Sequence, residues 1–220
     1  WRCNLPSHDD ECHLYVNSSL VAEHDNTCCD AHTNFLTKFL NTTDNIEYQV
    51  SEGGGGSHGS MEWCQIGGDK TFGTYPTWKF NVFNANNSFS DQNYVGYGTA
   101  TAPGTGSPVG ILDQNYGTSA PTFTTGTGSC ALTCGTDNFS VRFRTNKTYS
   151  NGVYVFRSAN GSNAANNDDG AGLVLNAGFD TDGGTYIAGL NSTTTSSTNQ
   201  ISAPVLLNGN YSLIYDMVEA

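Results

Sequence analysis

Apolar and polar residues alternate in short runs over most of the chain after residue 62. Six segments place their apolar residues on one face: 78–82, 139–143, 173–179, 186–190, 205–207 and 211–217. This period of two is typical of strands with one buried face. The run at 153–156 is continuously apolar, which predicts burial on both faces. Clusters of Gly, Asn and Pro separate these runs, so we predict an antiparallel β-sandwich.

The first 52 residues have a different pattern. Apolar and cysteine positions recur at helical spacing in 12–20 and again in 28–40, and Ser7 with Asp10 resembles a helix start. We therefore predict a helical hairpin with its turn at 23–26. Two short helices bury little surface, so a cystine from Cys12 to Cys28 or Cys29 is expected as a staple.

Residues 46–50 then alternate strictly, which predicts a strand with one buried face, formed by Ile46, Tyr48 and Val50. Gly53–Ser57 follows and leads into His58–Met61. Such a glycine run behaves as a flexible tether, and it also resembles a linker introduced to join two pieces of protein. Both interpretations give the same organisation: an acidic Cys/His-rich helical segment ending in a strand (1–52), a Gly/Ser linker (53–61) and a β-sandwich domain (62–220).

The pattern of strands in 138–144, 152–156 and 172–180 resembles that of lectin-like jelly rolls and laminin-G-like sandwiches. The likeness covers less than a quarter of the chain and includes no diagnostic site residue. It therefore bears on the fold class alone: mainly β, a jelly-roll or lectin-like sandwich preceded by a small disulfide-stapled helical hairpin.

Charge is sparse and unevenly distributed. Only 13% of the 220 residues are charged, yet the net charge is −12 and the isoelectric point is about 4.4. Residues 1–52 hold nine acidic and two basic residues, a net charge of −7. The lack of a basic face argues against nucleic-acid partners and against binding to anionic lipid. No apolar run approaches the roughly 20 residues that span a bilayer, so direct membrane insertion is not expected.

Eight Asn-x-Ser/Thr sequons and seven cysteines indicate an oxidising compartment. The sequence begins at Trp1 rather than Met, which fits a removed signal peptide or a chosen boundary. We expect a secreted or surface-exposed protein with N-linked glycans. The candidate glycan acceptors are Asn17, Asn41, Asn86, Asn138, Asn146, Asn160, Asn191 and Asn210.

An odd number of cysteines leaves one thiol free or bonded to another chain. Cys130 and Cys134 can close a small loop with each other, or either can pair elsewhere, for example with Cys64. The disulfide candidates are Cys3, Cys12, Cys28, Cys29, Cys64, Cys130 and Cys134.

Two clusters have metal-ligand residue types but weak spacing. His8, His13, His24 and His32 lack the short-spaced Cys or His pairs of a zinc site, so we expect solvated histidines on an acidic face. Asp180 and Asp182 resemble the start of a calcium loop, but no closing Glu follows, and a hairpin turn is favoured. Beyond glycans, no cofactor is expected.

Enzyme signatures are missing from the sequence. It contains no G-x-S-x-G, P-loop or dinucleotide fingerprint, and no His follows His58. We therefore predict a non-enzymatic structural glycoprotein that forms an extracellular filament, appendage or coat. Self-association or a second subunit is the expected partner, through strand addition by 46–50 and an intersubunit disulfide.

The alternative is a carbohydrate-binding adhesin, a lectin-like module or a viral surface glycoprotein. Its glycan ligand would stack on exposed aromatic rings. The candidates for that platform are Tyr75, Trp78, Tyr94, Tyr97 and Tyr116.

Overall fold

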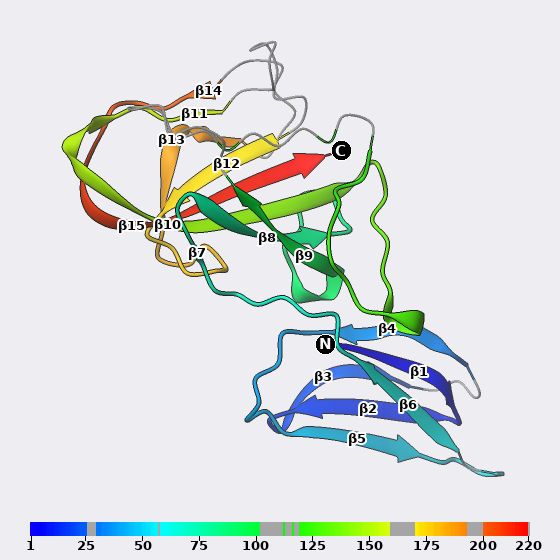
Figure 1. Cartoon of the computed structure of the whole chain (residues 1–220). Coiled ribbons are helices and arrows are strands. Elements are labelled where there is room, and N and C mark those ends of the chain that lie inside the picture. The colour runs from blue at the N-terminus through cyan, green and yellow to red at the C-terminus, as the bar shows by residue number, and fades with distance from the viewer. Residues whose placement is uncertain are drawn as a thin grey trace. The chain divides into compact units, whose positions relative to one another are not determined.

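In the residues that it describes, the computed structural model of the chain is mainly β-structure, arranged in antiparallel sheets (Figure 1). It describes residues 1–25, 30–56, 58–101, 112, 116, 119–158, 170–192 and 200–219. The chain forms two compact units. The N-terminal unit comprises Trp1–Gly67 with Gly126–Ala131, and the C-terminal unit comprises Gly68–Thr125 with Leu132–Ala220.

The N-terminal unit consists of two three-stranded antiparallel sheets. One has the strand order β4-β1-β6 and the other β3-β2-β5. A short 3-10 helix, η2 (Gly128–Cys130), lies in its second segment. The strands are β1 (Arg2–His8), β2 (Glu11–Val16), β3 (Ser19–His24), β4 (His32–Thr37), β5 (Ile46–Ser51) and β6 (Gly59–Cys64).

The predicted helical hairpin is wrong, because the described residues of 1–52 form strands. Asn17 and Ser18 both take positive φ angles, 51° and 63°, as the two-residue turn of a tight hairpin requires. That turn folds β3 back onto β2, so a helix cannot continue through these residues. Residues 59–61 of the predicted linker belong to β6, which pairs with β1.

A small core joins the two sheets of the N-terminal unit. Its buried members come from β1 and β4 on one side and from β2 on the other. Because residues of both sheets meet in one cluster, the sheets pack face to face. The cluster consists of Cys3, Leu5, Cys12, Leu14 and Leu36.

The C-terminal unit is built on one seven-stranded sheet with the order β13-β12-β15-β10-β8-β9, and β7 pairs with β10 in parallel. A separate two-stranded sheet joins β11 to β14. A 3-10 helix, η1 (Asp91–Asn93), precedes β9. The strands are β7 (Gly73–Thr74), β8 (Thr77–Phe83), β9 (Tyr94–Thr101), β10 (Phe139–Tyr154), β11 (Arg157–Ser158), β12 (Gly170–Leu175), β13 (Thr185–Ser192), β14 (Gln200–Ile201) and β15 (Val205–Glu219).

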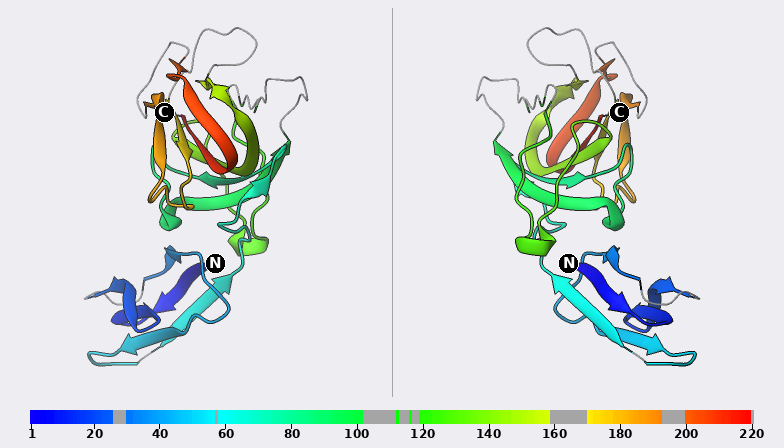
Figure 2. Two further views of the ribbon diagram at one scale, coloured as in Figure 1. Left: turned by 90° about the vertical axis from the view of Figure 1, so that its left-hand side faces the viewer. Right: turned by 90° about the vertical axis from the view of Figure 1, so that its right-hand side faces the viewer.

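One face of this sheet covers a large aromatic and aliphatic core, and the predicted apolar faces of 78–82 and 139–143 lie in it. The long strands β10 and β15 run side by side and curve together (Figure 2). The prediction for 153–156 is wrong, because Val153 and Val155 are 68% and 55% exposed. Segments 205–207 and 211–217, predicted as two strands, are one strand, β15.

Candidate functional site

Three of the five histidines meet at one end of the N-terminal unit. His8 is the last residue of β1, His24 the last of β3, and His32 the first of β4. Strand pairing places these strand ends together. Leu5 of β1 pairs with His32, and Cys12 of β2 pairs with His24. The cluster therefore draws on both sheets of the unit.

The imidazole rings are close enough to share one ligand. One candidate ligand nitrogen from each of His8, His24 and His32 lies within 4.8 Å of the other two. The Nε2 atoms of His8 and His32 are 2.9 Å apart. The ring centroids lie 5.0 Å apart for His8–His24 and His8–His32, and 4.2 Å apart for His24–His32.

Burial sets the electrostatics of this histidine cluster. His8 is fully buried, and its Nδ1 has no hydrogen-bond partner among the described atoms. The pKa of His32 is lowered, first by burial and then by the neighbouring His24 and His8. A lowered pKa keeps the imidazole neutral near pH 7, and neutral imidazole is the form that binds metal ions.

The sequence interpretation missed this convergence. The expectation of solvated histidines is wrong for His8, which is fully buried. His13 lies apart from the cluster, and its Nε2 is 2.9 Å from Oδ1 of Asp25. The signal in the sequence was the placement of three histidines at strand ends. A helical prediction for 1–52 conceals this pattern, because it places no strand ends there.

One disulfide is present in the described residues. It joins Cys64 of β6 to Cys130 of η2. Cys3, Cys12 and Cys134 are free thiols, so Cys12 forms no staple to Cys28 or Cys29. Burial raises the pKa of the Cys3 thiol to about 12, and the adjacent Cys12 adds to the shift. Cys28 and Cys29 themselves lie outside the described residues.

The sequon asparagines lie mostly on the surface. Six of the eight are exposed: Asn17, Asn41, Asn86, Asn138, Asn146 and Asn210. Asn160 and the side chain of Asn191 lie outside the described set.

Two of these sequons face each other in the β10–β15 pair. Asn146 pairs with Ser212, and Thr148 pairs with Asn210. The Thr148 hydroxyl donates a hydrogen bond to the Asn210 side-chain oxygen. Glycans on Asn146 and Asn210 would therefore project from neighbouring positions of one surface.

The predicted strand at 46–50 is confirmed as β5, an edge strand. It pairs along its length with β2 of the same chain, from Val16↔Ile46 to Glu11↔Ser51. The predicted buried face is wrong for Ile46 and Val50, which are 42% and 40% exposed, while Tyr48 is half-buried against the core. The strand is thus part of its own sheet and has one edge unpaired among the described residues.

The proposed calcium residues lie in a turn. Backbone hydrogen bonds close residues 178–184, and Thr181 has a positive φ angle of 68°. The Asp180 carboxylate is 3.4 Å from Nζ of Lys70. Neither Asp180 nor Asp182 joins a cluster of potential metal ligands in the described part of the chain.

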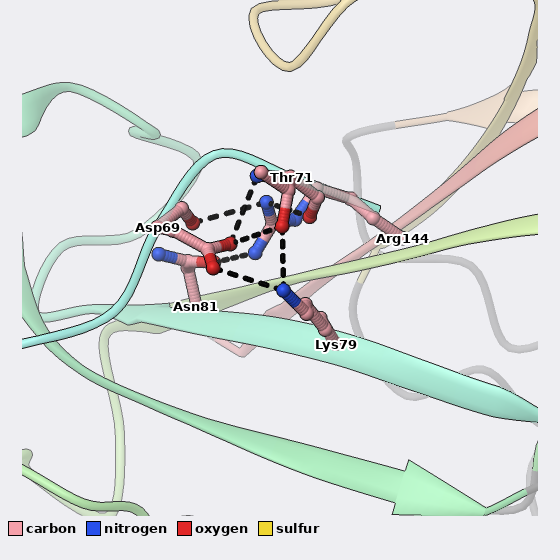
Figure 3. Close-up of polar contacts among 5 residues, drawn as sticks. All are labelled: Asp69, Thr71, Lys79, Asn81 and Arg144. Atoms are coloured by element: carbon pink, nitrogen blue, oxygen red, sulfur yellow. Dashed lines mark hydrogen bonds and ion pairs between the residues drawn. The ribbon is translucent and has the colours of Figure 1, made fainter. Parts of the chain in front are cut away.

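The second face of the C-terminal sheet buries two arginines. Asp216 accepts two hydrogen bonds of 2.7 Å from Arg142, whose Nη1 also donates to the Phe179 carbonyl at 2.8 Å. Arg144 donates to the carbonyls of Asp69 and Thr71 at 3.1 and 2.7 Å (Figure 3). These donors hold loops over the sheet, so we assign both arginines a structural role.

The predicted aromatic platform is wrong for two of its members. Trp78 and Tyr94 are buried, with 7% and 2% of their surface exposed. Tyr75, Tyr97 and Tyr116 are half-buried. An aromatic surface for stacking on sugars therefore cannot include the two buried rings.

Among the described residues, no helix has the length and hydrophobicity needed to cross a lipid bilayer. No protein-family model matches the chain. No curated protein matches it either. Among solved structures, the chain is similar to an anti-sigma factor domain-containing protein from Clostridium clariflavum, at 14% identity and a TM-score of 0.44, over 100% of this chain and 70% of that one.

Proposed function

We propose that this protein is a secreted, N-glycosylated, non-enzymatic structural glycoprotein that self-assembles on an extracellular surface. The observation that carries the proposal is β5, an edge strand whose Ile46 and Val50 side chains remain exposed. Natural edge strands are normally protected by charges, proline or a covering element. An edge flanked by exposed apolar side chains is suited to accept a strand from a second copy of this chain.

The location proposed for the protein rests on the sequons and the disulfide. Six exposed acceptor asparagines are distributed over both units, and Cys64–Cys130 is a bond of oxidising compartments. Glycans at these positions would hydrate a C-terminal unit that carries little charge. No sequon asparagine lies within β5, so the edge stays accessible.

For the C-terminal unit we propose a curved sandwich of the jelly-roll or lectin-like type. Its support is the covering of both sheet faces, one by the aromatic core and the other by the loops that Arg142 and Arg144 hold. Such a unit serves as a rigid scaffold, with assembly left to the N-terminal unit.

Charged substitutions at the β5 edge test whether the chain self-assembles through this strand. The double substitution Ile46→Lys and Val50→Lys places two charges beside the β5 edge without altering its pairing with β2. We expect sedimentation to show assemblies for the unaltered chain and monomers for the double variant. The matched control is Leu206→Lys, because Leu206 is 69% exposed in the C-terminal unit. Assemblies that survive the β5 charges, or that Leu206→Lys removes equally, would contradict assembly through β5.

Peptide mapping of protein made in a eukaryotic secretory pathway tests the location. Enzymatic removal of N-glycans converts each occupied Asn to Asp, which mass spectrometry detects. We expect occupancy at several of the six exposed sequons. A chain that is secreted without any N-glycan would contradict the glycoprotein part of the proposal.

A further inference from the structure

We infer that His8, His24 and His32 form a binding site for one divalent transition-metal ion of the zinc type. Imidazole nitrogen is a preferred ligand of Zn²⁺, Cu²⁺, Ni²⁺ and Co²⁺. One ring nitrogen from each of the three side chains lies close enough to the other two for a single ion to contact all three. The site is independent of the proposed role in assembly, since none of the three histidines lies on β5.

The distances agree with a shared ion. Zinc–nitrogen bonds are about 2.0–2.1 Å long, so two nitrogens on a tetrahedral zinc ion lie roughly 3.3 Å apart. The Nε2 atoms of His8 and His32 share a hydrogen bond of 2.9 Å, and one nitrogen from each of the three rings lies within 4.8 Å of the other two.

Burial of this cluster needs a compensating interaction. His8 is fully buried, and its Nδ1 lacks a partner among the described atoms. A buried polar nitrogen without a partner costs free energy, as does crowding three basic rings together. An ion bound to the rings would orient them and offset that cost.

A bound ion would join the two sheets of the N-terminal unit. His8 and His32 belong to the sheet β4-β1-β6, while His24 ends β3 of the other sheet. The buried core between the sheets is small, and its two cysteines are free thiols. Small domains with little core commonly depend on a disulfide or a structural metal. The ion is therefore inferred to be a structural cross-link.

Three other groups of potential ligands in the described residues are less suited to this role. Glu62 lies with Cys64 and Cys130, whose sulfur atoms are already joined in the disulfide. Asp9, Asp10 and Glu52 are at least partly exposed carboxylates. His13, Glu23 and Asp25 also lie at the surface, and His13 contacts Asp25. Acidic surface groups of this kind are common without any ion, so they serve here as comparisons.

The test uses the full chain after removal of metal by a chelator. Calorimetric titration with Zn²⁺ should give one tight site for the unaltered chain. Substitution of a residue that only hydrogen-bonds to a metal ligand lowers metal affinity about 10–100-fold. Loss of a direct ligand, in His24→Gln or His32→Gln, should therefore weaken Zn²⁺ binding at least about 100-fold. His58→Gln is the matched control, because His58 is exposed and outside the cluster. It should bind as the unaltered chain does.

Three results would overturn the inference: no Zn²⁺ binding by the unaltered chain, equal weakening by His58→Gln, or a loss of binding in His13→Gln alone. A measurement that needs no variant guards against misfolding. Nitrogen-15 NMR of the histidine rings during Zn²⁺ addition should shift His8, His24 and His32. Shifts confined to His13 and His58 would also overturn the site.

Discussion

The two units are built from the same kind of antiparallel strand but are stabilised in different ways. The C-terminal unit covers both faces of a seven-stranded sheet. Aromatic residues cover one face, and on the other Arg142 pairs with Asp216 while Arg144 donates to backbone carbonyls. The N-terminal unit has only short strands and a small core between two sheets. It adds the Cys64–Cys130 disulfide and the histidine cluster at strand ends.

This contrast shows how domain size determines the means of stabilisation. A small domain buries a smaller fraction of its surface on folding, so apolar packing alone leaves little margin. Cross-links then contribute a large share of the free energy of unfolding. A larger sheet tolerates buried charge when each charged group is paired and hydrogen-bonded.

The largest effect is expected in the C-terminal unit from Arg142→Met. Met preserves part of the packing against Phe89, whose ring lies 4.2 Å from the guanidinium carbon. Asp216, which is 9% exposed, loses the partner of both its oxygens. Leaving one member of a buried pair alone costs about 3–5 kcal/mol. Urea unfolding, followed peptide by peptide with hydrogen exchange, should show this loss in the C-terminal unit only.

The double variant Arg142→Met with Asp216→Leu provides the control for that measurement. Removing both charges leaves no unpaired carboxylate, so most of the lost stability should return. A single variant within about 1 kcal/mol of the unaltered chain would show that the pair contributes little.

The second prediction concerns the cross-link of the N-terminal unit. Replacing both Cys64 and Cys130 by Ser removes a bond between residues 66 positions apart. Closing a loop of this length stabilises a folded domain by about 2–4 kcal/mol. We expect faster hydrogen exchange in β6 and in Gly126–Ala131, with the C-terminal sheet unchanged. Equal loss of protection in β10 and β15 would contradict the independence of the two units.

The sequence predicted strands correctly where the apolar residues recur with a single period of two. Trp78, Phe80 and Val82 alternate without a competing helical pattern, and they lie together in the core of the C-terminal unit. In 12–20 two periods coexist, because Cys12, Leu14 and Val16 alternate while other residues fit helical spacing. The Asn17–Ser18 pair decides for the hairpin, since Asn readily adopts positive φ.

The histidine cluster could not be derived from spacing. His8, His24 and His32 converge only because β1, β3 and β4 end at the same place in two different sheets. That placement depends on the register of pairing, on a bulge in β1 between Asn4 and Ser7, and on sheet packing. None of these is a local property of the chain.

A third, smaller effect is expected at the hairpin turn of the N-terminal unit. Ser18 has a φ of 63°, a conformation that glycine adopts without steric cost. Ser18→Gly should therefore stabilise this unit by about 0.5–1 kcal/mol. Ser19→Gly, one residue later in β3, should destabilise it instead. Thermal unfolding of the two unglycosylated variants checks both signs, and a lower melting temperature for Ser18→Gly would contradict the turn assignment.

The smallest effect is a change in pH dependence confined to the N-terminal unit. Glu62 of β6 accepts hydrogen bonds from the Ser129 hydroxyl at 2.6 Å and from the Asn4 amide at 3.0 Å. These bonds lower the pKa of Glu62 below its ordinary value of 4.5. A carboxyl with a lower pKa in the folded state contributes stability above its unfolded pKa and loses it as pH falls through the folded pKa.

Glu62→Gln keeps the size of the side chain but removes its titration. The N-terminal unit of this variant should therefore lose less stability than the unaltered chain when the pH is lowered from about 5 to about 3. Hydrogen exchange of β6 at several pH values measures the slope, and the C-terminal strands provide the reference. Parallel slopes for the two proteins would show that the bonds to Ser129 and Asn4 do not couple the ionisation of Glu62 to folding. A flatter slope in β6 alone would show that ionised Glu62, through its bonds to Ser129 and Asn4, stabilises the N-terminal unit.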